Sequence, residues 1–325
     1  WRDWSSDVCS SDLALGVLIG AMVGQPGWAA FPDKPVRVTV AFAPGASTDI
    51  IARMLSEPMG AALGQPMVVE NKPGAGGNIA TQQVKAATAD GHTLLMHSVA
   101  VSVNPSLFRQ AGYDLVKDFE PVAMAGVTPN LLFVNPSVKA TTLAELIALA
   151  RTTPMSYASS GNGTTTHLGA ELLFRSLAGV DVVHVPHQPA AASVAVIGGT
   201  VPIGSTSMPP VVPHAKSGKV RPIAVMSLQR SPVLPEVPTV AELGYPGFEA
   251  STWFAVFAPA GTPPAVLDQL NQSFNRVLQS PDITEKFSKQ SLSVQPLDRT
   301  ALKTYIAAEV AKWGKVVRDA GIKID

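Results

Sequence analysis

The fold is decided by residues 36–64, which read VRVTVAFAPGASTDIIARMLSEPMGAALG. The apolar run from Val36 to Phe42 predicts a buried strand, which ends at a short Pro-Gly turn. From Thr48 to Leu63 apolar side chains recur at helical spacing, and Gly64 supplies a stop signal. Because a strand, a tight turn and a helix make the first half of a βαβ unit, this stretch predicts an α/β domain with a largely parallel sheet.

The alternation of strands and helices continues toward the C-terminus in two series. They are separated by a proline-punctuated passage, Phe119–Pro136, which carries two short apolar runs. Each series predicts its own α/β domain. The further predicted strands are Met67–Glu70, Thr93–His97, Ser156–Ser159, Val182–Val185, Arg221–Ser227 and Trp253–Ala258, and the further predicted helices are Asn78–Ala87, Leu143–Arg151 and Thr166–Leu177.

The C-terminal part is predicted to be helical, with two apolar stripes that we interpret as packing faces covering the first domain. Two strands, near Met124–Asn135 and Ala250–Phe257, are expected to cross between the domains. We therefore predict a two-lobed α/β fold of two domains joined by two crossing strands, with the cleft between the lobes as the default ligand site. Residues 31–128 and 251–325 would form domain 1, and residues 129–250 domain 2.

Composition excludes several classes of function. The chain has 325 residues, only 15% of them charged, and a formal net charge of +0, so it shows no overall signature of nucleic-acid binding. Its single cysteine, Cys9, cannot form an intramolecular disulfide, a cysteine-rich zinc site or an iron–sulfur cluster. We expect no cofactor, no bound metal and no nucleic-acid partner.

The N-terminal 30 residues predict export. The apolar run Leu13–Gly24, followed by Pro26 and the small-residue stretch Gly27–Ala30, is typical of a signal peptide and its cleavage site. The run is too short to cross a bilayer as a helix. Residues 1–12 do not fit an export signal, because they lack an initiating Met and carry aspartates where Lys or Arg is usual, and we interpret them as foreign to the native chain.

Two turns in the first domain carry features of an anion site. The first, Ala43–Asp49, joins a strand to a helix, where free N–H groups and the helix dipole favour a negative charge. The second, Asn71–Asn78, has three glycines in four positions, which let the backbone approach a ligand closely. It lacks the last glycine of a dinucleotide G-x-G-x-x-G motif and has no G-K-[ST], so a carboxylate fits better than a nucleotide.

A loop of the second domain, Ser159–His167, is predicted to supply hydroxyl and N–H groups from the opposite wall. His167 is expected in the first turn of a helix, where the dipole favours a neutral imidazole. An ordinary helix start or a core histidine would explain the same residues.

These motifs resemble the Bug-type (TctC-like) receptors of tripartite tricarboxylate transporters. The resemblance is carried, in order, by Phe31–Pro35, Ala43–Asp49 with Arg53, Glu70–Asn78, Tyr157–Leu168 and Trp253–Pro263. It implies a non-enzymatic periplasmic protein of the type II Venus-flytrap class. It further implies that the first two loops clamp a ligand carboxylate through backbone amides and waters, and that membrane subunits of the transporter are partners of a monomeric receptor.

The resemblance assigns the binding positions in this chain. Pro44–Thr48 and Gly74–Asn78 match the clamping loops, while Ser98–Ala100 and Ser159–His167 match positions that add contacts. Relatives commonly carry an aromatic residue and a glycine where this chain has His187 and Pro189, and whether His187 or Gln188 replaces a polar contact stays open. The candidate ligand-binding residues are Pro44, Gly45, Ala46, Ser47, Thr48, Asp49, Gly74, Ala75, Gly76, Gly77, Asn78, Ser98, Val99, Ala100, Ser159, Ser160, Gly161, Asn162, Thr164, Thr165, His167, His187, Gln188 and Ser205.

Departures from the family pattern bear on the ligand. Pro202 and Thr206 stand where many relatives carry acidic residues, which argues against an amino acid as the ligand. A small di- or tricarboxylate or an aromatic acid is expected instead.

Two alternative functions stay open at this point. A hydrolase would need a G-x-S-x-G elbow, which is absent, and a metal carrier would depend on His184 and His187.

Overall fold

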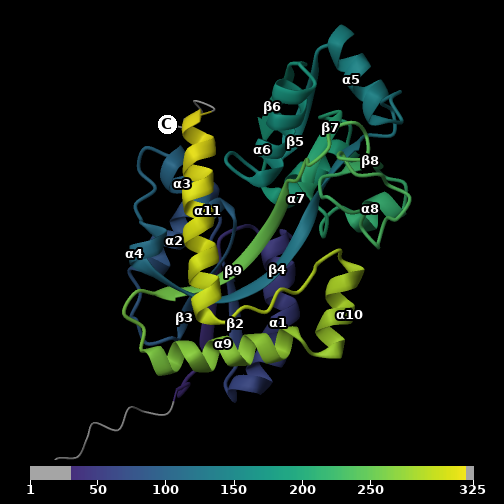
Figure 1. Ribbon diagram of the computed structural model, residues 1–325. Coiled ribbons are helices and arrows are strands. Elements are labelled where there is room, and N and C mark those ends of the chain that lie inside the picture. Colours follow the sequence, from purple (N-terminus) through teal and green to yellow (C-terminus); the bar gives the residue numbers. More distant parts are fainter. Residues whose placement is uncertain (1–30, 320–325) are drawn as a thin grey trace, which may run out of the picture. The chain divides into compact units, whose positions relative to one another are not determined.

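The computed structural model describes residues 31–319 of the chain, which belong to one compact unit (Figure 1). The predicted signal peptide and the segment before it lie outside these residues. Among the described residues, no helix combines the length and the apolar character needed to cross a membrane.

The first lobe is built on the predicted βαβαβ unit. Strands β1 (Val36–Val40), β2 (Met67–Asn71) and β3 (Thr93–Ser98) pair in parallel in the order β2-β1-β3. Helix α1 (Ser47–Leu63) follows β1, and α2 (Asn78–Lys85) follows β2 after one turn of 3-10 helix, Ala75–Gly77. Because parallel strands bring their carboxyl ends to one edge of a sheet, the turns after these strands gather at that edge.

Two long antiparallel strands connect the lobes, as predicted. Strand β9 (Ser251–Pro259) pairs with β3 at one side and with the first part of β4 (Phe119–Val134) at the other. The last residues of β4 then pair with the second-lobe strands, so β4 belongs to both sheets.

The second sheet has the order β4-β7-β5-β6, and β8 also pairs with β4. Strands β5 and β6 run parallel to each other, as do β5 and β7. Its strands are β5 (Met155–Ser159), β6 (Val182–Pro186), β7 (Ile203–Ser207) and β8 (Arg221–Val225), and its helices are α5 (Leu143–Thr152), α6 (Thr165–Glu171), a π-helical continuation (Leu172–Leu177), α7 (Pro189–Ile197) and α8 (Val212–Lys216).

Hydrophobic clusters fill both faces of each sheet. In the first lobe, α1 and α9 (Pro264–Leu278) pack on one face with residues such as Leu55 and Phe274, while residues of α11 (Arg299–Asp319), including Leu302, pack on the other. The C-terminal helices therefore cover the first lobe, as predicted. Three short helices complete the described part of the chain: α3 (Ala100–Leu107), α4 (Leu115–Asp118) and α10 (Pro281–Lys289).

Several elements differ from the expectation. The passage Phe119–Pro136 contains one long strand rather than two short runs, because shifts of the pairing register near Pro121 and Met124 accommodate its irregular residues. Strand β7 and helices α3, α4, α7 and α8 were not predicted. The residues of β7 are buried but mostly small and polar, and a hydropathy pattern does not detect such a strand. The exact domain boundaries given above stay a prediction.

Candidate functional site

The turn after β1 is shaped by a buried carboxylate. Gly45 adopts a φ of +81°, and its N–H donates to Asp49 Oδ2 at 2.9 Å. Asp49 also accepts from Arg53 Nε at 2.9 Å and from Asn71 Nδ2 at 2.9 Å. Burial raises the pKa of Asp49, but the hydrogen bonds from Arg53, Gly45 and Asn71 outweigh it and leave the pKa below its usual value. The ionised Asp49 thus fixes this turn to the end of β2 and pairs with Arg53 of its own helix.

The glycine turn, defined here as residues 74–78, needs its glycines. Gly74, Gly76 and Gly77 all have positive φ, of 132°, 64° and 95°. A Cβ at Gly77 would lie 2.1 Å from Nε2 of His97, which is fully buried beneath the turn. Burial lowers the pKa of His97 to about 4, so this ring is neutral at neutral pH.

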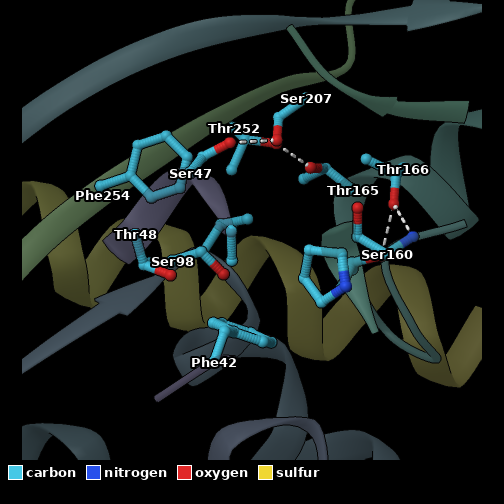
Figure 2. Close-up of a pocket in the computed structure, with 14 residues that line it drawn as sticks. Phe42, Ser47, Thr48, Ser98, Ser160, Thr165, Thr166, Ser207, Thr252 and Phe254 are labelled. Carbon is cyan, nitrogen blue, oxygen red and sulfur yellow. Dashed lines mark hydrogen bonds between the residues drawn. The ribbon is translucent and has the colours of Figure 1, made fainter. Parts of the chain in front are cut away.

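An inner pocket lies where the first turn of α1 meets the second lobe (Figure 2). Thr48 and Ser98 stand on one side and Ser160 and Thr165 on the other. None of the lining side chains is charged. The inner pocket is lined by Phe42, Ala46, Ser47, Thr48, Ser98, Val99, Ser160, Thr164, Thr165, Thr166, Pro189, Ser207, Thr252 and Phe254.

Two hydroxyls in the inner pocket have no partner. Thr48 Oγ1 and Ser160 Oγ are buried without a hydrogen bond, one in each lobe. Other hydroxyls there are paired, as Ser47 Oγ is with Ser207 Oγ at 2.7 Å, a contact that joins the lobes. The first N–H groups of α1, which have no partner within the helix, begin at the same place. The pocket thus offers neutral donors and no side-chain cation.

Little free space remains in the inner pocket. The volume open to the centre of a water molecule is about 20 Å³, which is enough for one water. An outer pocket adjoins it and shares Phe42 and Ser160 with it, and its corresponding volume is about 410 Å³. The outer pocket is lined by Phe42, Gly74, Ala75, Gly76, Gly77, Phe108, Ser160, Gly161, Asn162, Pro186, His187 and Gln188.

The two predicted clamping loops therefore border two adjoining pockets rather than one. The candidate residues that line the inner pocket are Ala46, Ser47, Thr48, Ser98, Val99, Ser160, Thr164 and Thr165. Those that line the outer pocket are Gly74, Ala75, Gly76, Gly77, Ser160, Gly161, Asn162, His187 and Gln188.

The remaining candidates line neither pocket, and several of them support the loops. Asp49 binds the turn as described, and Ser205 Oγ donates to the Thr166 carbonyl at 2.7 Å. The candidates outside both linings are Pro44, Gly45, Asp49, Asn78, Ala100, Ser159, His167 and Ser205.

The residues that sequence reasoning missed come mainly from strands and from loop ends. Phe254 belongs to the predicted strand Trp253–Ala258, and Thr252 directly precedes that strand. Because side chains alternate along a strand, both lie on the same face. That alternation was a usable signal. Thr166 lies within the predicted loop Ser159–His167 but was not among the candidate residues, and no comparable pattern pointed to the others. The missed lining residues are Phe42, Phe108, Thr166, Pro186, Pro189, Ser207, Thr252 and Phe254.

Two stacked histidines support the second-lobe loop. The rings of His167 and His184 lie 4.0 Å apart at an interplanar angle of 18°. His167 Nδ1 accepts from the Gly163 N–H at 3.2 Å, and His184 Nε2 lies 2.6 Å from Ser159 Oγ. Burial lowers the pKa of both rings, that of His184 to about 3. His167 is neutral as expected, but burial rather than the helix is the main cause.

The geometry gives no support to the two alternatives. The Ser159–His184 pair brings a hydroxyl to an imidazole, but Ser159 is fully buried and lines neither pocket, so a substrate in them would not reach it. In the part of the chain that the structure describes, no three side chains of His, Cys, Asp or Glu gather to hold a metal ion.

Comparison with known proteins identifies the family. The model of the family "Tripartite tricarboxylate transporter family receptor" matches residues 51–322. Protein BugT of Bordetella pertussis is 38% identical over 95% of this chain and 98% of its own.

Two solved structures of Rhodopseudomonas palustris proteins are similar to this chain. Rpa4515 with adipate is 34% identical, with a TM-score of 0.86 over 90% of this chain and 100% of its own. MatC with bound malate is 32% identical, with a TM-score of 0.83 over 88% and 100%.

The two-lobed α/β architecture is that of periplasmic binding proteins, whose solved structures it matches along most of its length. Receptors of this kind bind a solute and do not convert it, so the hydrolase alternative is set aside. The chain belongs to the receptor family of the tripartite tricarboxylate transporters and is a Bug-type, TctC-like solute-binding protein.

Proposed function

We propose that this receptor captures a small carboxylate, one carboxylate group of which binds in the inner pocket at the start of α1. The observation that carries the proposal is the pair of buried, unpartnered hydroxyls, Thr48 Oγ1 and Ser160 Oγ. Because a buried polar group without a hydrogen bond is costly, such a pair facing one small pocket favours a ligand that accepts from both. The first-turn N–H groups of α1 add donors and a favourable dipole for an anion.

The outer pocket supports a ligand that is longer than its first carboxylate. Asn162, His187 and Gln188 offer polar side chains to a distal part of the ligand, and no lining residue offers a carboxylate to an ammonium group. Both similar structures from Rhodopseudomonas palustris hold dicarboxylates, malate and adipate. A di- or tricarboxylate or an aromatic acid therefore fits these pockets better than an amino acid.

Family membership supports the cellular role. We infer that the receptor acts in the periplasm as a monomer after export by its signal peptide. There it would deliver its ligand to the membrane subunits of a tripartite tricarboxylate-type transporter. Since the inner pocket has room for only one water, the lobes have to separate before a ligand enters.

Thermal unfolding with a panel of acids tests the proposal. Malate, adipate, citrate and benzoate are compared with their uncharged amides. A ligand of the native state increases the free energy of unfolding by RT ln(1 + [L]/Kd) and so raises the melting temperature. Titration calorimetry then measures the affinity of the strongest acid. The proposal fails if no acid in the panel shifts the melting temperature, or if the amides shift it equally.

Replacement of Gly76 by valine tests the role of the glycine turn. A Cβ at Gly76 would lie 3.3 Å from the ring of Phe108, which lines the outer pocket, and 3.4 Å from Asn104 Nδ2. The variant is therefore expected to shift the turn and this pocket wall and to lose carboxylate binding, but to keep its fold. Gly179→Val is the matched control, since Gly179 has a φ of +63° against +64° for Gly76 and nothing lies near its missing Cβ. Both variants carry the same backbone strain, so equal affinities would argue against a contact at the turn.

A further inference from the structure

Asn104 of α3 lies directly behind the glycine turn. Its side chain is fully buried. Asn104 Nδ2 donates to the Gly76 carbonyl at 2.9 Å and to Asn78 Oδ1 at 2.8 Å, so one amide holds two positions of the turn. The orientation of the amide is fixed by chemistry, because a carbonyl oxygen only accepts and Nδ2 must face Gly76.

The other end of the same amide lies near the second lobe. Asn104 Oδ1 is buried and has no partner. A Cβ at Gly163, in the second-lobe loop, would lie 3.6 Å from this oxygen and 2.1 Å from Leu107 of the same helix. Helix α3 thus stands between the glycine turn of one lobe and the glycine-containing loop of the other.

We propose that Asn104 is a positioning residue for ligand capture: it holds the glycine turn in the conformation that presents its backbone to the outer pocket. The proposal rests on the proposed function of that site. Four consecutive residues of the turn, Gly74–Gly77, have positive φ, a conformation that is costly for Ala75 and that leaves its three glycines free to adopt others. The turn has two internal backbone hydrogen bonds, from Gly77 N to the Gly74 carbonyl and from Asn78 N to the Ala75 carbonyl. Asn104 supplies the support from outside it.

The chain contains a matched control. Asn275 of α9 also donates through Nδ2 to a backbone carbonyl, that of Leu297 at 3.0 Å, and to an asparagine Oδ1, that of Asn271 at 3.3 Å. Its own Oδ1 is buried without a partner, as in Asn104. Asn275 lines neither pocket. Equal substitutions at the two positions therefore remove the same two kinds of hydrogen bond, although Asn104 is fully buried and Asn275 only partly, and only one set reaches the glycine turn.

The experiment compares Asn104→Leu and Asn104→Asp with Asn275→Leu and Asn275→Asp. In the ligand-free proteins, amide hydrogen exchange is measured over residues 74–85. Exchange there is expected to accelerate in both Asn104 variants and to stay unchanged in both Asn275 variants. With malate and adipate as probes, calorimetry is expected to show binding at least about tenfold weaker in the Asn104 variants, equal to roughly 1.4 kcal/mol.

The aspartate variant adds a readout that lost stability would not produce. Its carboxylate cannot donate to Gly76 and Asn78, but its protonated form regains one donor, so its affinity relative to wild type is expected to rise from pH 8 to pH 5. Nearby titratable groups do not interfere, because burial lowers the pKa of His97 to about 4 and raises that of Tyr113. This variant also serves if Asn104→Leu fails to fold.

The outcomes separate the two proposals. Unchanged exchange over the turn in the Asn104 variants, or probe affinities equal to those of the Asn275 variants, would overturn the role of Asn104. Faster exchange in the Asn104 variants of a protein that binds none of malate, adipate, citrate and benzoate would support the positioning role and count against the proposed function instead.

Discussion

Replacement of Thr48 by valine is expected to stabilise the ligand-free receptor and to weaken its binding of carboxylates. The side chain of Thr48 is 1% exposed, and its Oγ1 has no hydrogen-bond partner. An unsatisfied buried hydroxyl costs roughly 1–3 kcal/mol, which valine of nearly the same shape avoids. Because the inner pocket has room for one water that can partly satisfy Thr48, we expect a gain near the lower end, about 1 kcal/mol.

The effect on binding has the opposite sign. A hydrogen bond from a hydroxyl to a charged group contributes about 1.5–3 kcal/mol, so its loss should weaken carboxylate binding by roughly 10- to 100-fold. Denaturant unfolding measures the first effect and calorimetry with malate or adipate the second.

Thr39→Val is the control for both measurements. Thr39 is fully buried with an unpartnered Oγ1 of its own but lines neither pocket. It should gain at least as much stability and keep wild-type affinity. The reasoning would be refuted if Thr48→Val bound its ligand as tightly as Thr39→Val does.

Two further predictions concern acid stability and lobe closure. Burial lowers the pKa of His97 to about 4 in the native state, whereas in the unfolded state the ring takes up a proton near pH 6.5. The free energy of unfolding should therefore fall as the pH drops from about 6.5 toward 4. His97→Leu should reduce this loss of stability when the free energy of unfolding is measured in urea at a series of pH values, and an unchanged pH dependence would contradict the role of His97. Leu168 of the second lobe packs with Val103 and Leu107 of α3. Leu168→Ala should therefore favour separated lobes, and X-ray scattering should show a larger radius of gyration for the ligand-free protein. Leu172→Ala, at a site 43% exposed, is its control and should leave that radius unchanged.

The sequence predicted the elements whose apolar side chains form a short run or recur at helical spacing. Strands β1 to β3 and helix α1 follow these patterns directly, because their apolar side chains enter the clusters on the faces of the first sheet. Strand β7 escaped detection for the opposite reason. Its residues Ser205, Thr206 and Ser207 are buried, but their hydroxyls are satisfied by backbone and by the other lobe, which composition does not reveal.

The candidate site was predicted in part, for a similar reason. Loop glycines and hydroxyls signal a close approach of backbone to ligand, and the predicted loops do border the pockets. The sequence does not tell a ligand-facing polar group from one that supports its neighbours. Asp49 and Ser159 look like ligand donors or acceptors in the sequence, but in the structure their partners are Gly45, Arg53 and His184.

The pairing of Arg53 with Asp49 has a consequence for the kinetics of capture. Arg53, in the second turn of α1, is paired with Asp49 of the same helix, and no Asp, Glu, Lys or Arg lines either pocket. A site of this kind does not draw anions in from a distance, so the association rate should depend little on ionic strength. Release of the solute likewise breaks no ion pair with the receptor, which suits a carrier that has to give up its cargo.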